Sequence, residues 1–246
     1  MTNTVLRRDQ GRVTEITLNR PQAGNAFDVD LVRDLHEALD TIDSEACEVV
    51  IFRGEGKGFC GGLDLSRVEE ESDASLLWRL VQIELLLQRI ASLPQLTVAL
   101  AHRFAFGAGA DLFVACRRRI VAPGTRFAFP GVRFGIALGT GRLSRCVGPD
   151  AARRLLAATR PVELEDALAL GLVQGQAETV TWKTVVTQLS ETESALDARM
   201  AGIVTNILSS GEDDRDLAEL VRSAALPGLK QRITSYAEKV AASRKR

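Results

Sequence analysis

Three glycine-rich segments of this 246-residue sequence could bring backbone groups together to do chemistry. They span residues 54–62, 107–109 and 131–141. A glycine at a strand-to-helix turn lets several backbone N–H groups point the same way, and a helix that begins there adds its dipole. Such a turn binds a phosphate group or a developing oxyanion, although each segment taken alone could equally be a plain turn.

Several familiar binding signatures are incomplete in this sequence. The segments GAGADL (107–112) and GTGRLS (139–144) begin as G-x-G but lack the third small residue of a dinucleotide-binding fingerprint. His36 lies in HEALD, without the second histidine of a zinc-binding H-E-x-x-H helix. We therefore expect neither a nicotinamide cofactor nor a metal site.

Hydrophobic patterns predict the elements that hold the glycine turns. Strands are expected where short apolar runs occur, and helices where apolar residues recur every three or four positions. The predicted strands cover 13–18, 48–52, 96–100 and 119–122, and the predicted helices cover 28–42 and 75–91. An apolar segment that begins at the second glycine turn ends near residue 115. This alternation is typical of an α/β fold with crossover connections. We expect a core over residues 1–180 and a purely helical region over 181–246.

Composition and charge exclude other classes of protein. A net charge of −1 argues against a chain built to coat nucleic acid. No apolar run is long enough to cross a membrane. The four cysteines contain no C-x-x-C pair, and the first residues do not read as a signal peptide. We therefore expect a cytoplasmic protein with reduced thiols.

The order of the motifs is more specific than any one of them. The segments are ITLNRPQAGNAF, VVIFRGEGKGFCGGLDL, LTVALAHRFAFGAGADLFVAC, TRFAFPGVRFGIALGTGRLSRCVG and ALALGLV. In this order and spacing, over about residues 10–175, the sequence resembles the enoyl-CoA hydratase/isomerase family, the crotonases. The resemblance implies an α/β, crotonase-like spiral of ββα units, followed by C-terminal helices that form a homotrimer or hexamer. It also implies an acyl-CoA thioester as substrate, with coenzyme A as part of that substrate and no separate cofactor.

The resemblance also implies where the site residues lie. The backbone N–H groups of Gly61 and Ala108 would bind the thioester oxygen and stabilise an enolate, and Asp111 would carry a proton. The residues expected to contact CoA are Asn25, Ala26, Phe27, Lys57, Gly58, Gly62, Asp64 and Leu65.

The departures from the family pattern concern the proton-transfer groups. Hydratases of the family hold a water between two glutamates; here the first position is Asp111 and the second is Gly131. The later aspartate of some isomerases is matched by Gly139. We therefore expect one-carboxylate chemistry, such as double-bond migration, thioester hydrolysis or decarboxylation, with crotonyl-CoA hydration at least about 100-fold below an ordinary hydratase. The substitution Gly131→Glu is expected to raise hydration. The alternative is a CoA-ester-binding or assembly subunit with little or no catalysis.

Several side chains near the motifs keep two interpretations. Asp111 could be a proton carrier or a helix cap, whereas for Asp64 we prefer the interpretation as a helix cap. Cys60 favours packing over a nucleophile because the sequence places no histidine beside it. For His102 and Arg103 we prefer a role in forming the turn over contact with a ligand. Arg133 and Arg142 could select an acidic acyl group or face solvent. An apolar stripe, which predicts a subunit interface, comprises Leu196, Met200, Ile203, Val204, Ile207 and Leu208.

Overall fold

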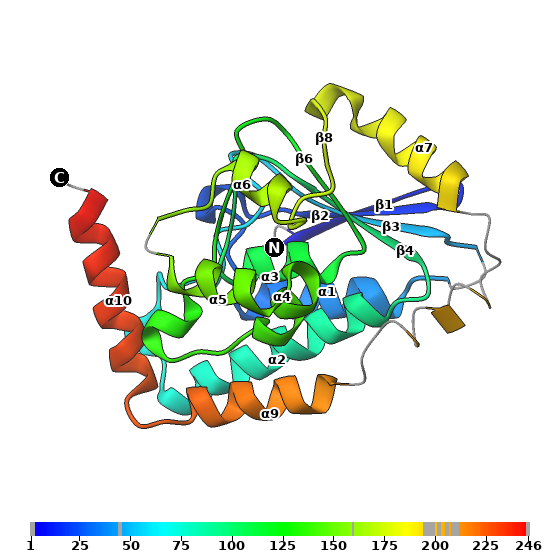
Figure 1. Ribbon diagram of the computed structural model, residues 1–246. Helices are drawn as coiled ribbons and strands as arrows, with labels where there is room; N and C mark the ends of the chain where they lie inside the picture. Colours follow the sequence, from blue (N-terminus) through cyan, green and yellow to red (C-terminus); the bar gives the residue numbers. More distant parts are fainter. Residues whose placement is uncertain are drawn as a thin grey trace.

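The computed structural model describes residues 3–43, 46–158, 160–193, 200, 203–204, 207 and 212–244. Strands and helices alternate along the chain and build a six-stranded sheet in the order β1-β2-β3-β4-β6-β8 (Figure 1). Strands β5 and β7 form a second, two-stranded sheet. The strands are β1 Val5–Gln10, β2 Val13–Leu18, β3 Val49–Gly54, β4 Leu96–Ala101, β5 Phe104–Phe106, β6 Arg118–Val121, β7 Arg126–Ala128 and β8 Gly175–Gln176.

The helices connect and cover these strands. The α-helices are α1 Val29–Asp40, α2 Asp73–Ser92, α3 Ala108–Ala115, α4 Thr140–Val147, α5 Pro149–Ala157, α6 Leu164–Ala169, α7 Trp182–Glu193, α9 Asp213–Ala224 and α10 Leu229–Arg244. The short 3₁₀ helices within the described ranges are η1 Pro21–Ala23, η2 Val68–Glu70, η3 Gly131–Phe134 and η4 Thr179–Thr181.

The pairing of the large sheet is parallel except at one edge. β1 runs antiparallel to β2, whereas β2, β3, β4, β6 and β8 pair in parallel. Parallel neighbours require crossover connections, and α1 and α2 supply two of them. The prediction of an α/β fold with crossovers is confirmed.

The two faces of the large sheet pack against different helices. On β2 and β3, residues such as Ile16 and Phe52 join the main core with α1, α2 and α3, while Ile51 faces the other way. Trp182 and Val186 of α7 cover that second face, where Figure 1 shows α7 across the sheet from α1 and α2. Helix α7 therefore packs as part of the core, although it follows residue 180, where the sequence places the end of the core.

Local capping explains where two predicted helices begin. Asp28 precedes α1 and accepts a hydrogen bond of 2.8 Å from the N–H of Leu31. Ser72 precedes α2 and forms a reciprocal capping box with Ser75. Each cap satisfies N–H groups that have no partner inside the helix.

The C-terminal helices α9 and α10 pack on α2 rather than on the sheet. Leu220 and Ile233 lie in one apolar cluster with Leu80. Asp73, at the start of α2, accepts hydrogen bonds from three successive N–H groups, 228–230, where α10 begins. Among the residues that the structure describes, no helix is both long and apolar enough to span a membrane.

The predicted apolar stripe is only partly described. Leu196 and Leu208 lie outside the described residues. Met200, Ile203 and Ile207 are exposed in the single chain. Exposed apolar side chains of this kind are consistent with a partner surface, so assembly into a trimer or hexamer stays a prediction.

Candidate active site

Two of the glycine turns lie against each other. Gly62 has a φ of +94°, and a Cβ atom there would lie 2.7 Å from the carbonyl oxygen of Phe106. Only glycine accepts both the left-handed backbone and this close approach. Gly107 follows Phe106 directly and precedes α3, so the packing brings the segment 61–65 against the N-terminus of that helix.

Two backbone N–H groups have no acceptor at this junction. Phe27 bonds to the segment on both sides of Leu63, donating to the Gly62 carbonyl at 2.7 Å and accepting from the Asp64 N–H at 3.0 Å. In an extended segment, the N–H groups of successive residues point to opposite sides, so the N–H of Leu63 faces away from Phe27. Neither that N–H nor the N–H of Ala108, in the first turn of α3, finds a partner in the described part of the chain.

The expected donor Gly61 is engaged elsewhere. Its N–H donates to the carbonyl oxygen of Gly24 at 2.9 Å. On this turn, the N–H that remains available is that of Leu63, two residues further on. The pairing of Ala108 with Gly61 is therefore corrected to Ala108 with Leu63.

Asn25 supports the first glycine turn from inside the protein. Its side chain is buried, and its amide nitrogen donates to the carbonyl oxygens of Glu55 at 2.9 Å, Gly58 at 3.0 Å and Phe59 at 3.2 Å. Its amide oxygen accepts from the N–H of residue 20 at 2.9 Å. Phe27 is likewise buried completely. Both side chains hold the turn and do not face a ligand, which corrects their expected contact with CoA.

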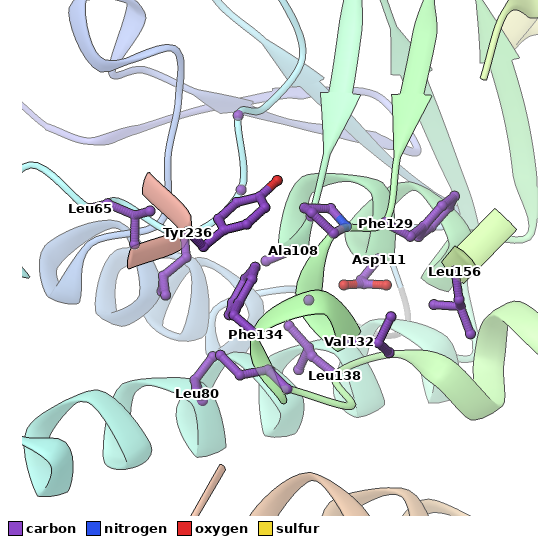
Figure 2. Close-up of a pocket in the computed structure, with 17 residues that line it drawn as sticks. Leu65, Leu80, Ala108, Asp111, Phe129, Val132, Phe134, Leu138, Leu156 and Tyr236 are labelled. Atoms are coloured by element: carbon purple, nitrogen blue, oxygen red, sulfur yellow. The ribbon is translucent and has the colours of Figure 1, made fainter. Parts of the chain in front are cut away.

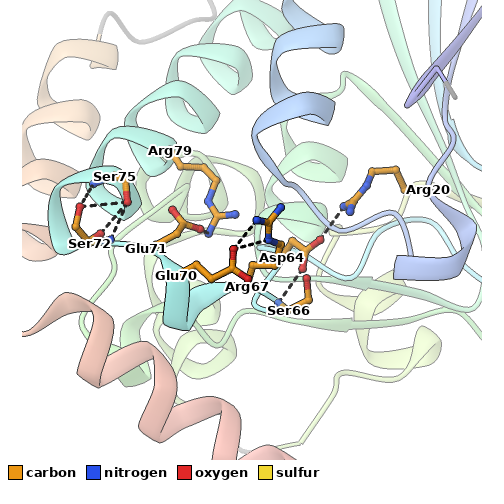
Figure 3. A network of polar contacts seen from close by, with 9 residues as sticks. All are labelled: Arg20, Asp64, Ser66, Arg67, Glu70, Glu71, Ser72, Ser75 and Arg79. Atoms are coloured by element: carbon orange, nitrogen blue, oxygen red, sulfur yellow. Dashed lines mark hydrogen bonds and ion pairs between the residues drawn. The ribbon is translucent and has the colours of Figure 1, made fainter. Parts of the chain in front are cut away.

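Asp64 takes part in a network of polar contacts (Figure 3). Its carboxylate pairs with Arg20 at 2.9 Å and accepts from the N–H of Ser66 at 2.9 Å. Burial opposes ionisation of this carboxyl, but the bonds from Ser66 and the Arg20 guanidinium hold its pKa below the usual value. Arg20 also pairs with Asp28, the cap of α1, at 2.9 Å. Asp64 therefore fixes the chain just after Leu63 and caps a turn, not the helix that the sequence predicted.

The other expected CoA contacts differ in their accessibility. Ala26 is buried, and its carbonyl accepts from Arg20. Gly58 is buried, and a Cβ atom there would collide with the ring of Phe104. Lys57 is exposed, whereas Leu65 and Gly62 line the pocket described next.

An apolar pocket opens at the two free N–H groups (Figure 2). Leu63, Ala108 and Asp111 line it, and the ionisable side chains in its lining are Asp111 and Tyr236. The rest of the lining is Gly61, Gly62, Leu65, Leu80, Gly107, Phe129, Pro130, Gly131, Val132, Phe134, Ile136, Leu138 and Leu156. Figure 2 shows Asp111 and Tyr236 on opposite sides of Ala108.

Helix α10 completes this pocket. The ring of Tyr236 packs against that of Phe134 with centroids 4.6 Å apart. Arg232, one turn earlier on α10, donates to the carbonyl oxygen of Phe134 at 3.1 Å. Sequence analysis missed Tyr236 and Phe134 because no motif connects residues a hundred positions apart.

Asp111 lies in the pocket wall with little access to solvent. Its residue surface is 6% exposed, and burial raises the pKa of its carboxyl well above the usual value, with Arg142 lowering it and Glu84 raising it. A carboxylate whose pKa is raised in this way is a stronger base than an exposed one and can accept a proton from a bound substrate. This environment favours the proton carrier over the helix cap.

Neither position expected for a second acid can hold one without rearrangement. A Cβ atom on Gly131 would lie 2.9 Å from the carbonyl oxygen of Ile136, inside the turn that η3 forms. Gly139 has a φ of +65°, and a Cβ atom there would collide with Oδ1 of Asp111. The backbone carbonyl of Ile136 blocks the first place, and the Asp111 carboxyl fills the second.

The remaining predicted residues are placed as follows. Burial raises the pKa of the Cys60 thiol to about 12, so this cysteine packs as expected. Nε2 of His102 lies 2.9 Å from the carbonyl oxygen of Gly56, and Arg103 has a left-handed φ of +57°, which confirms their turn role. Arg133 is exposed, but Arg142 is buried and paired with Glu84. Neither alternative for Arg142 was right, because its partner lies on α2, far away in sequence.

Comparison with known proteins identifies the family. The sequence model described as enoyl-CoA hydratase/isomerase matches residues 8–187. The chain belongs to this family. That match includes both glycine turns and Asp111, and it confirms the predicted crotonase membership and an enzyme of this family.

Individual relatives agree with this assignment. The chain is 30% identical over 181 residues to a short-chain-enoyl-CoA hydratase of Clostridium acetobutylicum, covering 72% of this chain and 69% of that protein. It is 31% identical over 175 residues to an ethylmalonyl-CoA decarboxylase of Gallus gallus, covering 69% of this chain and 59% of that one. A crystal structure described as an enoyl-CoA hydratase/isomerase from Bordetella parapertussis superposes with a TM-score of 0.92 at 38% identity, covering 96% of this chain and 99% of that chain.

Proposed function

We propose that this protein acts on an acyl-CoA thioester and moves a proton at the carbon next to the thioester carbonyl. The supporting observation is one pocket that joins the N–H groups of Leu63 and Ala108 to the carboxyl of Asp111. The two N–H groups would donate to the thioester oxygen as it gains charge. One such donor is typically worth about 3 kcal/mol of transition-state stabilisation.

A single carboxyl group suffices for double-bond migration. The Asp111 carboxylate would take a proton from C2 of a 3-enoyl thioester, and the released electron pair would move onto the thioester oxygen as a dienolate. The Asp111 carboxylic acid would then return the proton at C4, which gives the 2-enoyl thioester and restores the carboxylate. No second acid or base takes part.

Hydration of a 2-enoyl thioester has a different requirement. One group must activate the water and another must deliver the proton to C2. Gly131 and Gly139 provide no such group, and the geometry around both resists one. We therefore favour isomerisation over hydration, with thioester hydrolysis and decarboxylation as further one-carboxyl reactions.

A panel of acyl-CoA thioesters in deuterated buffer, followed by mass spectrometry, tests this function. Isomerisation predicts conversion of a 3-enoyl to a 2-enoyl thioester without the mass increase of a water. Deuterium enters the product only to the extent that the proton on Asp111 exchanges with solvent before it is returned to C4. Crotonyl-CoA hydration at the rate of a two-carboxylate enzyme would overturn the proposal. A binding or assembly subunit, which the missing second acid also allows, predicts tight binding of acetoacetyl-CoA with no conversion of any thioester in the panel.

A further inference from the structure

A buried ion pair next to Asp111 has no part in the reaction as described so far. Arg142 on α4 and Glu84 on α2 have side chains that are 6% and 1% exposed. Both terminal nitrogens of Arg142 donate to the two carboxylate oxygens of Glu84, one of them at 2.8 Å. Gln88 donates to the same carboxylate at 2.9 Å. A two-pronged pair of this kind fixes the direction of the guanidinium as well as its distance.

Asp111 lies against the helix that carries Arg142. Helix α4 begins after Gly139, and the space where a side chain of Gly139 would lie is filled by the Asp111 carboxyl. Arg142 follows Gly139 by three residues, about one helical turn. The charge of Asp111 interacts with both Arg142 and Glu84. The three groups therefore form one buried cluster across α2, α3 and α4.

We propose that Glu84 and Arg142 are positioning residues that act through Asp111. The pair presents a neutralised guanidinium to the Asp111 carboxyl and so determines how readily Asp111 takes up and releases the substrate proton. This inference rests on the proposed function for its catalytic meaning, because it concerns the same carboxyl group.

The charge balance gives the physical reason. A lone guanidinium beside a buried carboxyl favours the ionised form and makes it a weak base. Glu84 offsets that cation, so burial keeps the pKa of Asp111 raised. Of the other groups facing the cluster, Cys60 has a pKa of about 12 and stays neutral, and Asp216 of α9 acts on Arg142.

A purely structural pair, holding α2 to α4, makes a different prediction. Glu84→Gln keeps the shape of the side chain but leaves the Arg142 cation unbalanced. Our proposal then requires Asp111 to lose its proton at lower pH. Adding Arg142→Met removes the cation and must reverse that shift. A structural role predicts lost stability in both variants without this reversal.

The experiment is a ¹³C NMR titration of the full chain labelled at the aspartate γ-carbon, with Asp111→Asn used to assign the signal. We expect Glu84→Gln to lower the Asp111 midpoint by about one pH unit or more, and the double variant to return it to the wild-type value or above. Glu212→Gln is the matched control, because it removes an exposed ion pair of 3.0 Å from Arg145 on the same helix.

Each outcome has one meaning. A midpoint that stays in place or rises in Glu84→Gln overturns the proposal. If Glu84→Gln fails to fold, the double variant replaces it, because it removes both charges of the pair. An Asp111 midpoint at or above the wild-type value in the double variant supports the proposal. A lower midpoint contradicts it. Because the titration needs no substrate, the expected shift without any acyl-CoA turnover would reject the proposed function but retain the role of the pair.

Discussion

A glutamate at position 131 would give the pocket a second carboxylate, and the turn around it should resist the change. The Cβ atom would lie 2.9 Å from the carbonyl oxygen of Ile136, where ordinary contact begins at 3.4 Å. The turn is closed by a 3.0 Å bond from the Ile136 N–H to the Gly131 carbonyl. It must therefore open by about half an ångström. Overpacking of this kind costs about 1–3 kcal/mol, or a melting temperature lower by about 2–12 °C in a domain this large.

The assay combines thermal unfolding at pH 7.5 with crotonyl-CoA hydration. From the sequence, Gly131→Glu is expected to raise hydration, but the structure leads us to expect an unstable variant with no gain. Val132→Glu is the matched control, because Val132 is 38% exposed, lines the same pocket and would carry the same charge without the backbone contact. A Gly131→Glu protein that melts like the wild type and hydrates crotonyl-CoA tenfold faster would refute this reasoning.

The remaining predictions concern Asp111 and assembly. Asp111→Asn should lower turnover at least about 100-fold in the thioester panel. Asp111 ionises at its ordinary pKa in the unfolded chain but at a higher pKa in the folded chain. The free energy of unfolding therefore falls as pH rises from the first pKa to the second. Asp111→Asn should therefore raise the melting temperature at pH 8 relative to wild type but not at pH 3, and equal effects at both would contradict the buried charge. Sedimentation should show a trimer or hexamer at micromolar concentration, and a monomer would contradict the expected interface.

Helices and strands whose apolar residues are regularly spaced could be predicted from the sequence. The strand over 13–18 and the helix expected over 28–42 were found, because the spacing of their apolar residues is a local feature. Strand β1 was missed because it is an edge strand whose residues are mostly polar and only partly buried. No apolar alternation marked it.

The site was predictable only in its position along the chain. Ala108 and Asp111 do line one pocket, as the motifs indicated. Which N–H is free on the first turn depends on the bond from Gly61 to Gly24, a pairing that no local pattern encodes. The partner of Arg142 lies on α2, 58 residues earlier, for the same reason.

Calorimetric titration with acetoacetyl-CoA, an enolate mimic, tests the central claim most directly. Ala108 is the first residue of α3, a position where proline is well tolerated, so Ala108→Pro removes one N–H donor with little effect on the helix. We predict micromolar binding to the wild type, about −8 kcal/mol, and binding at least about tenfold weaker to Ala108→Pro, with free CoA bound equally by both. No heat from the wild type at millimolar ligand, or unchanged affinity in Ala108→Pro, would contradict an oxyanion site at these two N–H groups.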